Sequence, residues 1–427
     1  MLRRLLVLVL MLLSAGVAWG QNPPPLDQAE QVRLLLERVQ QLEKRVNELE
    51  AKQAAVSTAP TPTEIAANVP PAAPVATQPA AATTAVQEHR HDAQEAQAAV
   101  QQMETHYPSL QIRGFGDVDF SATDQKGTTS GFNLGEFVLH TSSALSKKVS
   151  AFGEIAFDPQ QEGWTVDVER AILRYDLNDY FKLSFGRFHT PINYWNTAYH
   201  HGTWLQTTIS RPEMILFHGE FLPAHFVGLM GEGHLPSGGA NLEYNVGVGN
   251  GRSFFLHEPG QAGDSNNNRA WFVNIYSRPT RLYGLQFGGS VYGDKIVLAD
   301  GRNFRELITS AHLVWTKGDP EFLAEFANVN HRNILTNVAT NNTAFYVQVG
   351  YRLPWLEKSL KPYYRFEHTH TPLSEQVFTN MDLVGSIAGL RYDITSYAAF
   401  KAEYRNTKRQ PGDPRVNGLF LQTDFTF

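Results

Sequence analysis

The residues best suited to chemistry gather in one polar segment, His189–Pro223. Its imidazole, aromatic, guanidinium and carboxylate side chains are those of His189, Tyr194, Trp195, His200, His201, Trp204, Arg211, Glu213, His218 and Glu220. Such groups could position small charged solutes in a narrow aqueous passage, or serve in acid–base catalysis. No spacing in the chain singles out a nucleophile beside its base, so a hydrolase is the less favoured interpretation.

Three further motifs carry residue types found in ion or phosphate sites but lack the rest of the pattern. Glu88–Asp92 places two histidines between two acids, which a solvated helix face explains better than a metal site without further ligands. Asp264–Asn268 begins like a calcium loop, yet Gly at the sixth place and Glu at the twelfth are missing. Gly247–Gly251 opens no helix and so predicts no nucleotide cradle. The chain has no cysteine, and we expect no catalytic residues, no metal site and no cofactor.

The elements that must position these side chains are predicted to be β-strands, because apolar and polar residues alternate with a period of two over the last three quarters of the chain. Phe345, Val347 and Val349, for example, alternate with Tyr346 and Gln348. Sixteen strands are predicted: Leu110–Ala122, Phe132–Leu145, Val149–Phe157, Trp164–Leu177, Phe181–Phe188, Ala224–Gly231, Ala240–Gly249, Arg269–Ser277, Leu282–Asp294, Phe304–Thr316, Glu321–Val329, Thr343–Leu353, Pro362–His370, Leu383–Ile394, Ala398–Arg405 and Gly418–Phe427.

The connections distinguish a membrane barrel from a soluble β-sandwich, which alternation alone would also fit. Even-numbered strands lead into short turns such as Ser146–Lys148 and Asn178–Tyr180. Odd-numbered strands lead into longer polar loops, such as Asn250–Asn268, Asn330–Asn342, Thr371–Asp382 and Asn406–Asn417. Aromatic residues expected to form a girdle beside the short turns are Tyr175, Tyr180, Tyr283, Trp315, Trp355, Tyr397 and Phe427. These features are typical of an outer-membrane β-barrel.

The first quarter of the chain is predicted to be separate from the barrel. Residues 1–20 carry a basic head, a short apolar run and small residues, the pattern of a secretory signal peptide. Residues 26–53 form a predicted coiled coil, and residues 54–107 an Ala/Pro-rich disordered linker with a polar helical segment. The coiled-coil seam consists of Val32, Leu35, Val39, Leu42, Val46 and Leu49. The predicted fold class is therefore an all-β, sixteen-stranded antiparallel transmembrane barrel over residues 108–427, with an N-terminal α-helical coiled coil and a disordered linker.

Charge and heptad pattern limit the partners. A net charge of −6 without a basic domain excludes nucleic acid as the expected partner. The heptads imply self-association. Their Val/Leu seam favours a dimer, whereas porin barrels are usually trimers, and we expect a homotrimer while the sequence leaves this conflict open. The other expected partners are outer-membrane lipid and lipopolysaccharide, with peptidoglycan as a candidate for the periplasmic N-terminal segment.

The last strand resembles the C-terminal strand of Gram-negative outer-membrane proteins. Gly418–Phe427 has apolar residues at alternate positions and ends in Phe427. The resemblance implies that Phe427 is an assembly signal read by the barrel-assembly machinery and that the chain resides in the cell outer membrane. The order of coiled coil, spacer and barrel is similar to that of the DcaP-like porins and, more loosely, of the phosphate-selective porins O and P. No substrate motif of these families carries over onto particular residues.

In sixteen-stranded porins the third loop folds into the lumen, and His189–Pro223 resembles such a loop. The alternative is an outside loop that packs on its neighbours or on another protomer. The residues predicted to line the pore or its constriction are Arg113, Asp117, Arg170, Arg174, Arg211, Glu213, Arg365, Arg391, Lys401 and Arg405. Further charged residues expected on the inward face are Asp119, Glu154, Lys182, Glu321, Glu325, Arg352, Glu367 and Glu403.

Two charge arrangements follow from this set, and the sequence leaves both open. The basic residues could form a ladder along the pore wall, or the acids could neutralise them and leave a nearly unselective lumen. The function predicted is that of a porin for passive diffusion of small hydrophilic solutes, with anions as candidates. The alternatives are an envelope-tethering barrel, in which the coiled coil and spacer matter more than the pore, and an outer-membrane hydrolase.

Overall fold

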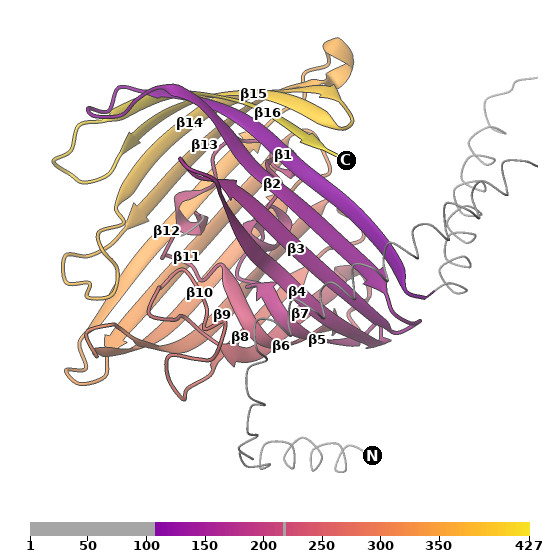
Figure 1. Ribbon diagram of the computed structural model, residues 1–427, viewed down its shortest axis with the longest axis vertical. Coiled ribbons are helices and arrows are strands. Elements are labelled where there is room, and N and C mark those ends of the chain that lie inside the picture. The colour runs from indigo at the N-terminus through magenta and orange to yellow at the C-terminus, as the bar shows by residue number, and fades with distance from the viewer. Residues whose placement is uncertain (1–106, 217–218) are drawn as a thin grey trace, which may run out of the picture. The chain divides into compact units, whose positions relative to one another are not determined.

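The computed structural model describes residues 107–216 and 219–427. The predicted signal peptide, the coiled coil with its six seam residues, and all but the last residue of the predicted linker lie outside the described residues. Across the described part, sixteen strands form one closed antiparallel barrel in which each strand pairs with the next and β16 pairs with β1. Figure 1 shows this closure, where yellow β16 runs beside indigo β1. The predicted sixteen-stranded barrel is confirmed.

All sixteen predicted strands are present, with ends that differ from the prediction by a few residues. The first eight are β1 (Ser109–Thr123), β2 (Gly131–Ala144), β3 (Val149–Pro159), β4 (Trp164–Asn178), β5 (Phe181–His189), β6 (His225–His234), β7 (Leu242–Asn250) and β8 (Ala270–Ser277). The last eight are β9 (Leu285–Val297), β10 (Asn303–Trp315), β11 (Glu321–Asn333), β12 (Ala339–Gly350), β13 (Leu360–His370), β14 (Leu383–Thr395), β15 (Ala398–Lys408) and β16 (Val416–Thr426). Short helical segments in the connections are α4 (Trp195–Ala198), η1 (Thr203–Leu205), η2 (Glu213–Ile215), η3 (Gly238–Ala240) and η4 (Leu356–Lys358).

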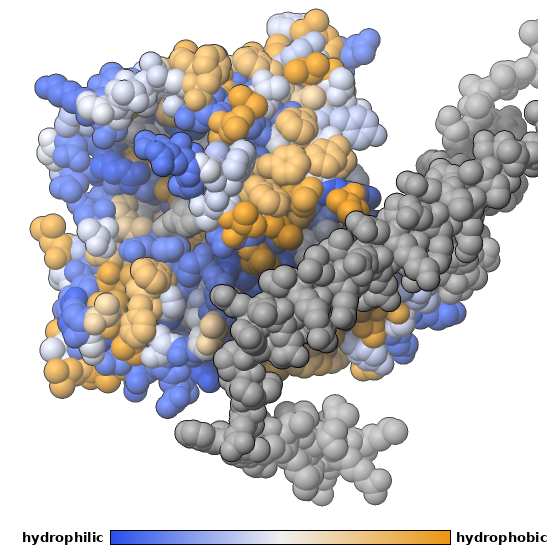
Figure 2. Space-filling model, viewed as in Figure 1, coloured by the Kyte–Doolittle hydropathy of each residue, from blue (hydrophilic) through white to orange (hydrophobic). Residues whose placement is uncertain are grey.

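The two faces of the barrel wall have opposite polarity. On β10, Leu307, Leu313 and Trp315 face outward and are 41–44% exposed, whereas Glu306 and His312 face inward and are buried. Figure 2 shows hydrophobic residues gathered over the part of the outer face where β1 and β2 run. Apolar side chains outside and polar ones inside are what a lipid-facing barrel requires. Among the described residues, no helix is long and apolar enough to cross a membrane.

Connections of different length mark the two ends of the barrel, called here the turn end and the loop end. The loop end carries the connections 190–224, 251–269 and 371–382. One prediction is wrong: the long loop Asn330–Asn342 is a short connection over residues 334–338, because β11 and β12 keep pairing as far as Arg332 and Ala339. The seven predicted girdle aromatics lie at the turn end, and all of them are 41–77% exposed.

Candidate pore constriction

The connection 190–224, called loop L3 from here on, lies inside the barrel. It begins one residue later than predicted, because His189 still belongs to β5. Trp195 of L3 is fully buried, and its ring meets Tyr346 of β12 edge-on with 5.8 Å between centroids. Near the other end of L3, Phe221 stacks on Phe378 of connection 371–382 at 5.8 Å. Large aromatic side chains would lose this burial if L3 lay outside the barrel.

Carboxylates on the far wall hold the backbone of L3. Glu325 of β11 accepts hydrogen bonds from the backbone N–H groups of Tyr194 and Trp195 at 2.9 and 2.7 Å. Glu403 of β15 accepts hydrogen bonds from the N–H groups of residues 209–210 at 3.0 and 3.2 Å. Glu403 also pairs with Arg405, and hydrogen bonds to such an ionised acceptor are roughly twice as strong as neutral ones. L3 is therefore attached to the wall at two points fifteen residues apart, at residues 194–195 and 209–210.

Three cations on neighbouring strands hold the carbonyl oxygens of the same stretch. Arg365 of β13, Arg391 of β14 and Lys401 of β15 are all buried, at 0–7% exposure. Their backbone acceptors are Ser210 and Arg211 for Arg365, Trp204 and Gln206 for Arg391, and Thr203 and Thr208 for Lys401, at 2.6–3.3 Å. These three side chains bind the loop instead of facing open water. They therefore cannot form the central part of the predicted ladder of basic residues along the pore wall.

A cavity of about 380 Å³ lies on the loop-end side of L3. Asp117, Glu136 and Arg405 line it. Asp117 accepts a hydrogen bond from Thr203 Oγ1 of L3 at 3.2 Å. Arg405 pairs with Glu403 at 2.6 Å, and its guanidinium lies 3.5 Å from the centroid of the Phe420 ring. Positive and negative groups are mixed in this compartment.

The remaining predicted wall residues lie on the turn-end side of L3. Arg170 pairs with buried Glu154, and Arg174 pairs with Asp176 and Glu232 at 2.6 and 3.0 Å. Both arginines line a cavity of about 480 Å³. Arg170 also lines an adjoining cavity of about 380 Å³ that L3 bounds on its other side. Arg113, exposed on β1, is inward-facing near the same end.

Two predicted site residues belong to L3 itself and stabilise its path. Arg211 donates hydrogen bonds to the carbonyl oxygens of Ile215 and His200. Burial lowers the pKa of Arg211 to about 10, while nearby carboxylates favour its charged form, so it stays charged at neutral pH. Glu213 pairs with Arg409, beyond the end of β15, at 2.5 Å. His218 lies outside the described residues.

Several inward residues were missed by reasoning from the sequence. Glu136 lines a cavity beside L3, at a register shift in β2: Phe132 and Leu134 before it face outward, whereas Val138 after it faces inward, as Glu136 does. Glu169 and His225 are also inward-facing and buried. Trp164, Val166 and Val168 face outward and so place Glu169 inward, whereas Leu173, Tyr175 and Leu177 place Arg170 inward. This change of parity within β4 was a sequence signal for both residues.

Known proteins match this chain in structure and not in sequence. No family model and no curated protein sequence matches it. An anion-selective porin from Comamonas acidovorans aligns with a TM-score of 0.56 at 9% identity, covering 75% of this chain and 100% of that chain. Salmonella typhi OmpF, in complex with daunomycin, aligns with a TM-score of 0.53 at 12% identity, covering 75% of this chain and 98% of that chain. The outer membrane channel DcaP of Acinetobacter baumannii aligns with a TM-score of 0.53 at 14% identity, covering 75% of this chain and 97% of that chain.

The TM-score of DcaP is no higher than those of the other two porins. Membership of the DcaP-like or O/P subfamilies therefore stays a prediction. What all three share with this chain is the barrel architecture. The chain has the fold of the bacterial outer-membrane porins.

Proposed function

We propose that this chain is an outer-membrane porin through which small hydrophilic solutes diffuse passively, and that L3 forms its constriction. The observation that carries the proposal is the attachment of L3 across the lumen by Glu325, Glu403, Arg365, Arg391 and Lys401. A loop held by charge-assisted hydrogen bonds keeps its position in a water-filled pore. The polar cavities on both sides of L3, the apolar outer face and the porin fold support the same function.

The charges on the turn-end side of L3 favour small anions in this proposal. Arg113, Arg170 and Arg174 supply fixed positive charge there, and fixed charge in a narrow pore selects ions by sign. Glu154, Asp176 and Glu232 offset part of it through their ion pairs with Arg170 and Arg174. The anion-selective porin from Comamonas acidovorans has the same fold, which is consistent with this preference.

The oligomeric state and the surroundings are part of the proposal. The heptads of residues 26–53 support a homo-oligomer, which we propose to be a trimer in lipid and lipopolysaccharide. We propose that the barrel-assembly machinery reads the last strand, and that the N-terminal segment lies in the periplasm close to peptidoglycan.

Planar-bilayer recording tests the central function. Protein extracted from outer membranes should produce discrete current steps in KCl, because a water-filled passage beside L3 conducts ions. Heat-modifiable migration on a denaturing gel would show that the same sample is a folded barrel. A folded barrel that passes no current would contradict the porin and favour the tethering alternative.

Replacing Arg170 and Arg174 with Gln should shift permeability toward cations. The change leaves Glu154 and Glu232 without their arginine partners in a confined passage. The reversal potential in a KCl gradient measures the shift, which should shrink at 1 M salt, where the screening length is about 3 Å. Arg281→Gln, on the exposed turn between β8 and β9, is the matched control. An unchanged reversal potential in the double variant, or an equal change in the control, would argue against this assignment.

A further inference from the structure

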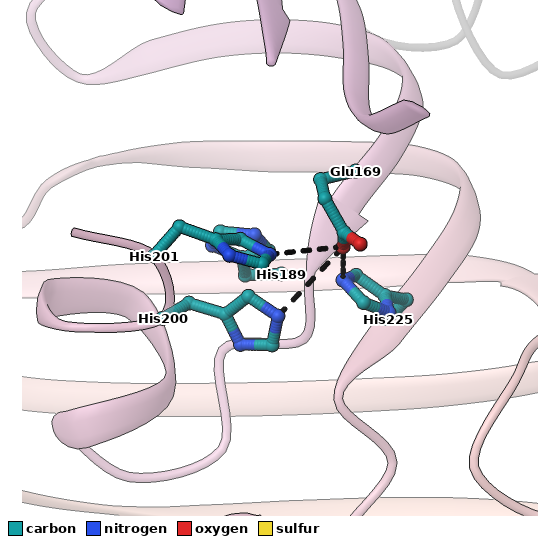
Figure 3. Close-up of side chains that lie close together, drawn as sticks. All are labelled: Glu169, His189, His200, His201 and His225. Carbon is teal, nitrogen blue, oxygen red and sulfur yellow. Dashed lines mark ion pairs between the residues drawn. The ribbon is translucent and has the colours of Figure 1, made fainter. Parts of the chain in front are cut away.

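Five buried side chains that the proposed pore does not use lie together where L3 meets β4, β5 and β6. They are Glu169, His189, His200, His201 and His225, each at most 7% exposed. One possible ligand atom from each lies within 4.8 Å of all the others. Figure 3 shows His200, His201 and His225 converging on one carboxylate oxygen of Glu169. The nitrogen–oxygen distances are 3.8, 3.3 and 2.5 Å respectively.

A β-bulge turns Glu169 into this cluster. On the β3–β4 pair, Glu154 is opposite Arg170 and Ile155 is opposite Val168, so Glu169 is an extra residue without a partner on β3. A bulge of this kind re-aims a side chain, and bulges are over-represented next to functional sites. Glu169 and Arg170 consequently both face the lumen, although they are consecutive in the chain.

The other four residues come from two strand ends and from L3. His189 is the last residue of β5 and His225 the first of β6, and the two are directly opposite each other. His200 and His201 follow the short helix α4 of L3. The cluster therefore joins L3 to the wall on the side away from Arg365 and Lys401.

Neighbouring residues set the hydrogen positions on the two L3 histidines. Asn196 donates its amide hydrogens to two backbone carbonyl oxygens at 2.8 Å, so its own oxygen is left to accept from Nδ1 of His200, also at 2.8 Å. Arg211 also approaches Nδ1 of His200, but at 3.3 Å, so the nearer Asn196 oxygen keeps the proton on Nδ1 and the lone pair on Nε2, the atom that faces Glu169. His201 Nδ1 lies 3.0 Å from Glu136. In metal sites, the ring nitrogen of histidine that does not bind the metal usually donates its hydrogen to a carboxylate or a carbonyl oxygen, as His200 and His201 do here.

His189 and His225 differ in their surroundings. Neither ring nitrogen of His189 has a hydrogen-bond partner among the described residues, although the ring is buried, and its Nε2 lies 3.4 Å from Glu154. Arg187 approaches Nδ1 of His225 at 3.1 Å. Because arginine can only donate, this contact puts the ring proton of His225 on Nε2, toward Glu169. His225 therefore orients the carboxylate, and His189 is free to bind.

Carboxylates and guanidinium groups surround the cluster. Glu136, Glu154, Glu169 and Glu258 are the four carboxylates that contact its histidines. Arg170, Arg187 and Arg211 are the three guanidinium groups that contact these carboxylates or histidines. Among the described residues, groups of both signs therefore surround the cluster, and Glu169 is the carboxylate at its centre. Glu169 is buried, and burying a carboxylate costs free energy, which a bound cation would offset.

We propose that Glu169, His189, His200 and His201 bind one divalent transition-metal ion of the Zn²⁺ class and so fasten L3 to β4 and β5. Three imidazoles and one carboxylate are a donor set that zinc uses, and imidazole also suits copper, nickel and iron. Bond lengths of about 2.0–2.2 Å separate ligand atoms by roughly 3.4 Å in a tetrahedron, so small side-chain movements close the cluster on an ion. The site does not depend on the proposed transport function.

An ion can reach the cluster from the lumen. His200 lines the cavity of about 380 Å³ on the loop-end side of L3, and His189 lines the cavity of the same size on the turn-end side. The cluster lies between these two compartments, with one ligand in each wall.

Metal uptake by the full-length protein, purified without an affinity tag and stripped with a chelator, tests the proposal. After incubation with Zn²⁺ and gel filtration, the wild type should retain one Zn²⁺ per chain more than His200→Gln/His201→Gln. His89, His91 and His106 are present in both proteins, so any binding outside the described residues cancels in the difference. With Co²⁺ the wild type should show the visible absorption of a four-coordinate site, and the double variant should not. Asn196→Ala should weaken binding about 10- to 100-fold, because it releases the His200 ring.

His312→Gln is the matched control, because His312 is a buried, inward-facing histidine that contacts Gln286 away from the cluster. It should bind Zn²⁺ as the wild type does. Heat-modifiable migration checks that each variant is folded, and Glu169→Gln replaces the double variant if that fails to fold. Equal Zn²⁺ retention by folded wild type and ligand variants, or no four-coordinate Co²⁺ spectrum in the wild type, would overturn the site while leaving the porin proposal untouched.

Discussion

Deleting residues 199–211 should raise the single-channel conductance several-fold. This stretch of L3 crosses the lumen and fills the space in front of β13, β14 and β15, where Arg365, Arg391 and Lys401 bind its carbonyl oxygens. Its removal widens the passage and exposes these three cations to water. The newly exposed cations should also increase the preference for anions at low salt, because fixed charge acts on ions in a confined lumen.

The matched control is a deletion of residues 125–129, in the exposed connection between β1 and β2. This deletion removes loop residues without touching L3, and its conductance should stay that of the wild type. Heat-modifiable migration must show that both barrels are folded. If a folded L3 variant conducts like the wild type, L3 does not form the constriction.

Phe427→Asp should abolish assembly of the barrel. Phe427 and Gly114 of β1 exchange backbone hydrogen bonds at 3.0 and 3.1 Å, which continues the ladder that closes β16 on β1. The Phe427 ring stacks on Phe137 with 5.8 Å between centroids. A carboxylate at this outward, lipid-facing position adds a desolvation cost at the seam where the barrel closes. The amount of heat-modifiable protein in the outer membrane measures the effect.

Two further substitutions separate the ring from the charge. Phe427→Tyr keeps the aromatic ring and should assemble. Gly114→Val should assemble poorly, because a Cβ atom on Gly114 would lie 2.2 Å from the Phe427 ring. Wild-type amounts of folded Phe427→Asp would mean that neither this contact nor the terminal residue is required for assembly.

Two sequence patterns were enough to predict the barrel. Apolar and polar side chains alternate along each strand, and short turns alternate with longer loops between the strands. In a strand the side-chain period is two whatever the strand pairs with, so each strand could be recognised locally, and an even number of strands closes a barrel. The aromatic residues beside the short turns, such as Trp355 and Tyr397, could be assigned to one end for the same reason. Strand ends were less certain, because the continued pairing of β11 with β12 depends on both strands together.

Only the tertiary structure decided which inward charges face water and which support L3. Arg174 and Arg365 have the same sequence signature, yet Arg174 lines a cavity and Arg365 is buried against the L3 backbone. The bulge likewise places both Glu169 and Arg170 on the inward face, where a regular strand would place only one of them, and brings Glu169 to histidines 20 to 56 positions farther along the chain. Alternation is a local property, so the sequence pattern could predict the strands of the barrel wall. The path of L3 is instead set by hydrogen bonds to strands more than a hundred residues away in the chain, and the pattern could not predict these contacts.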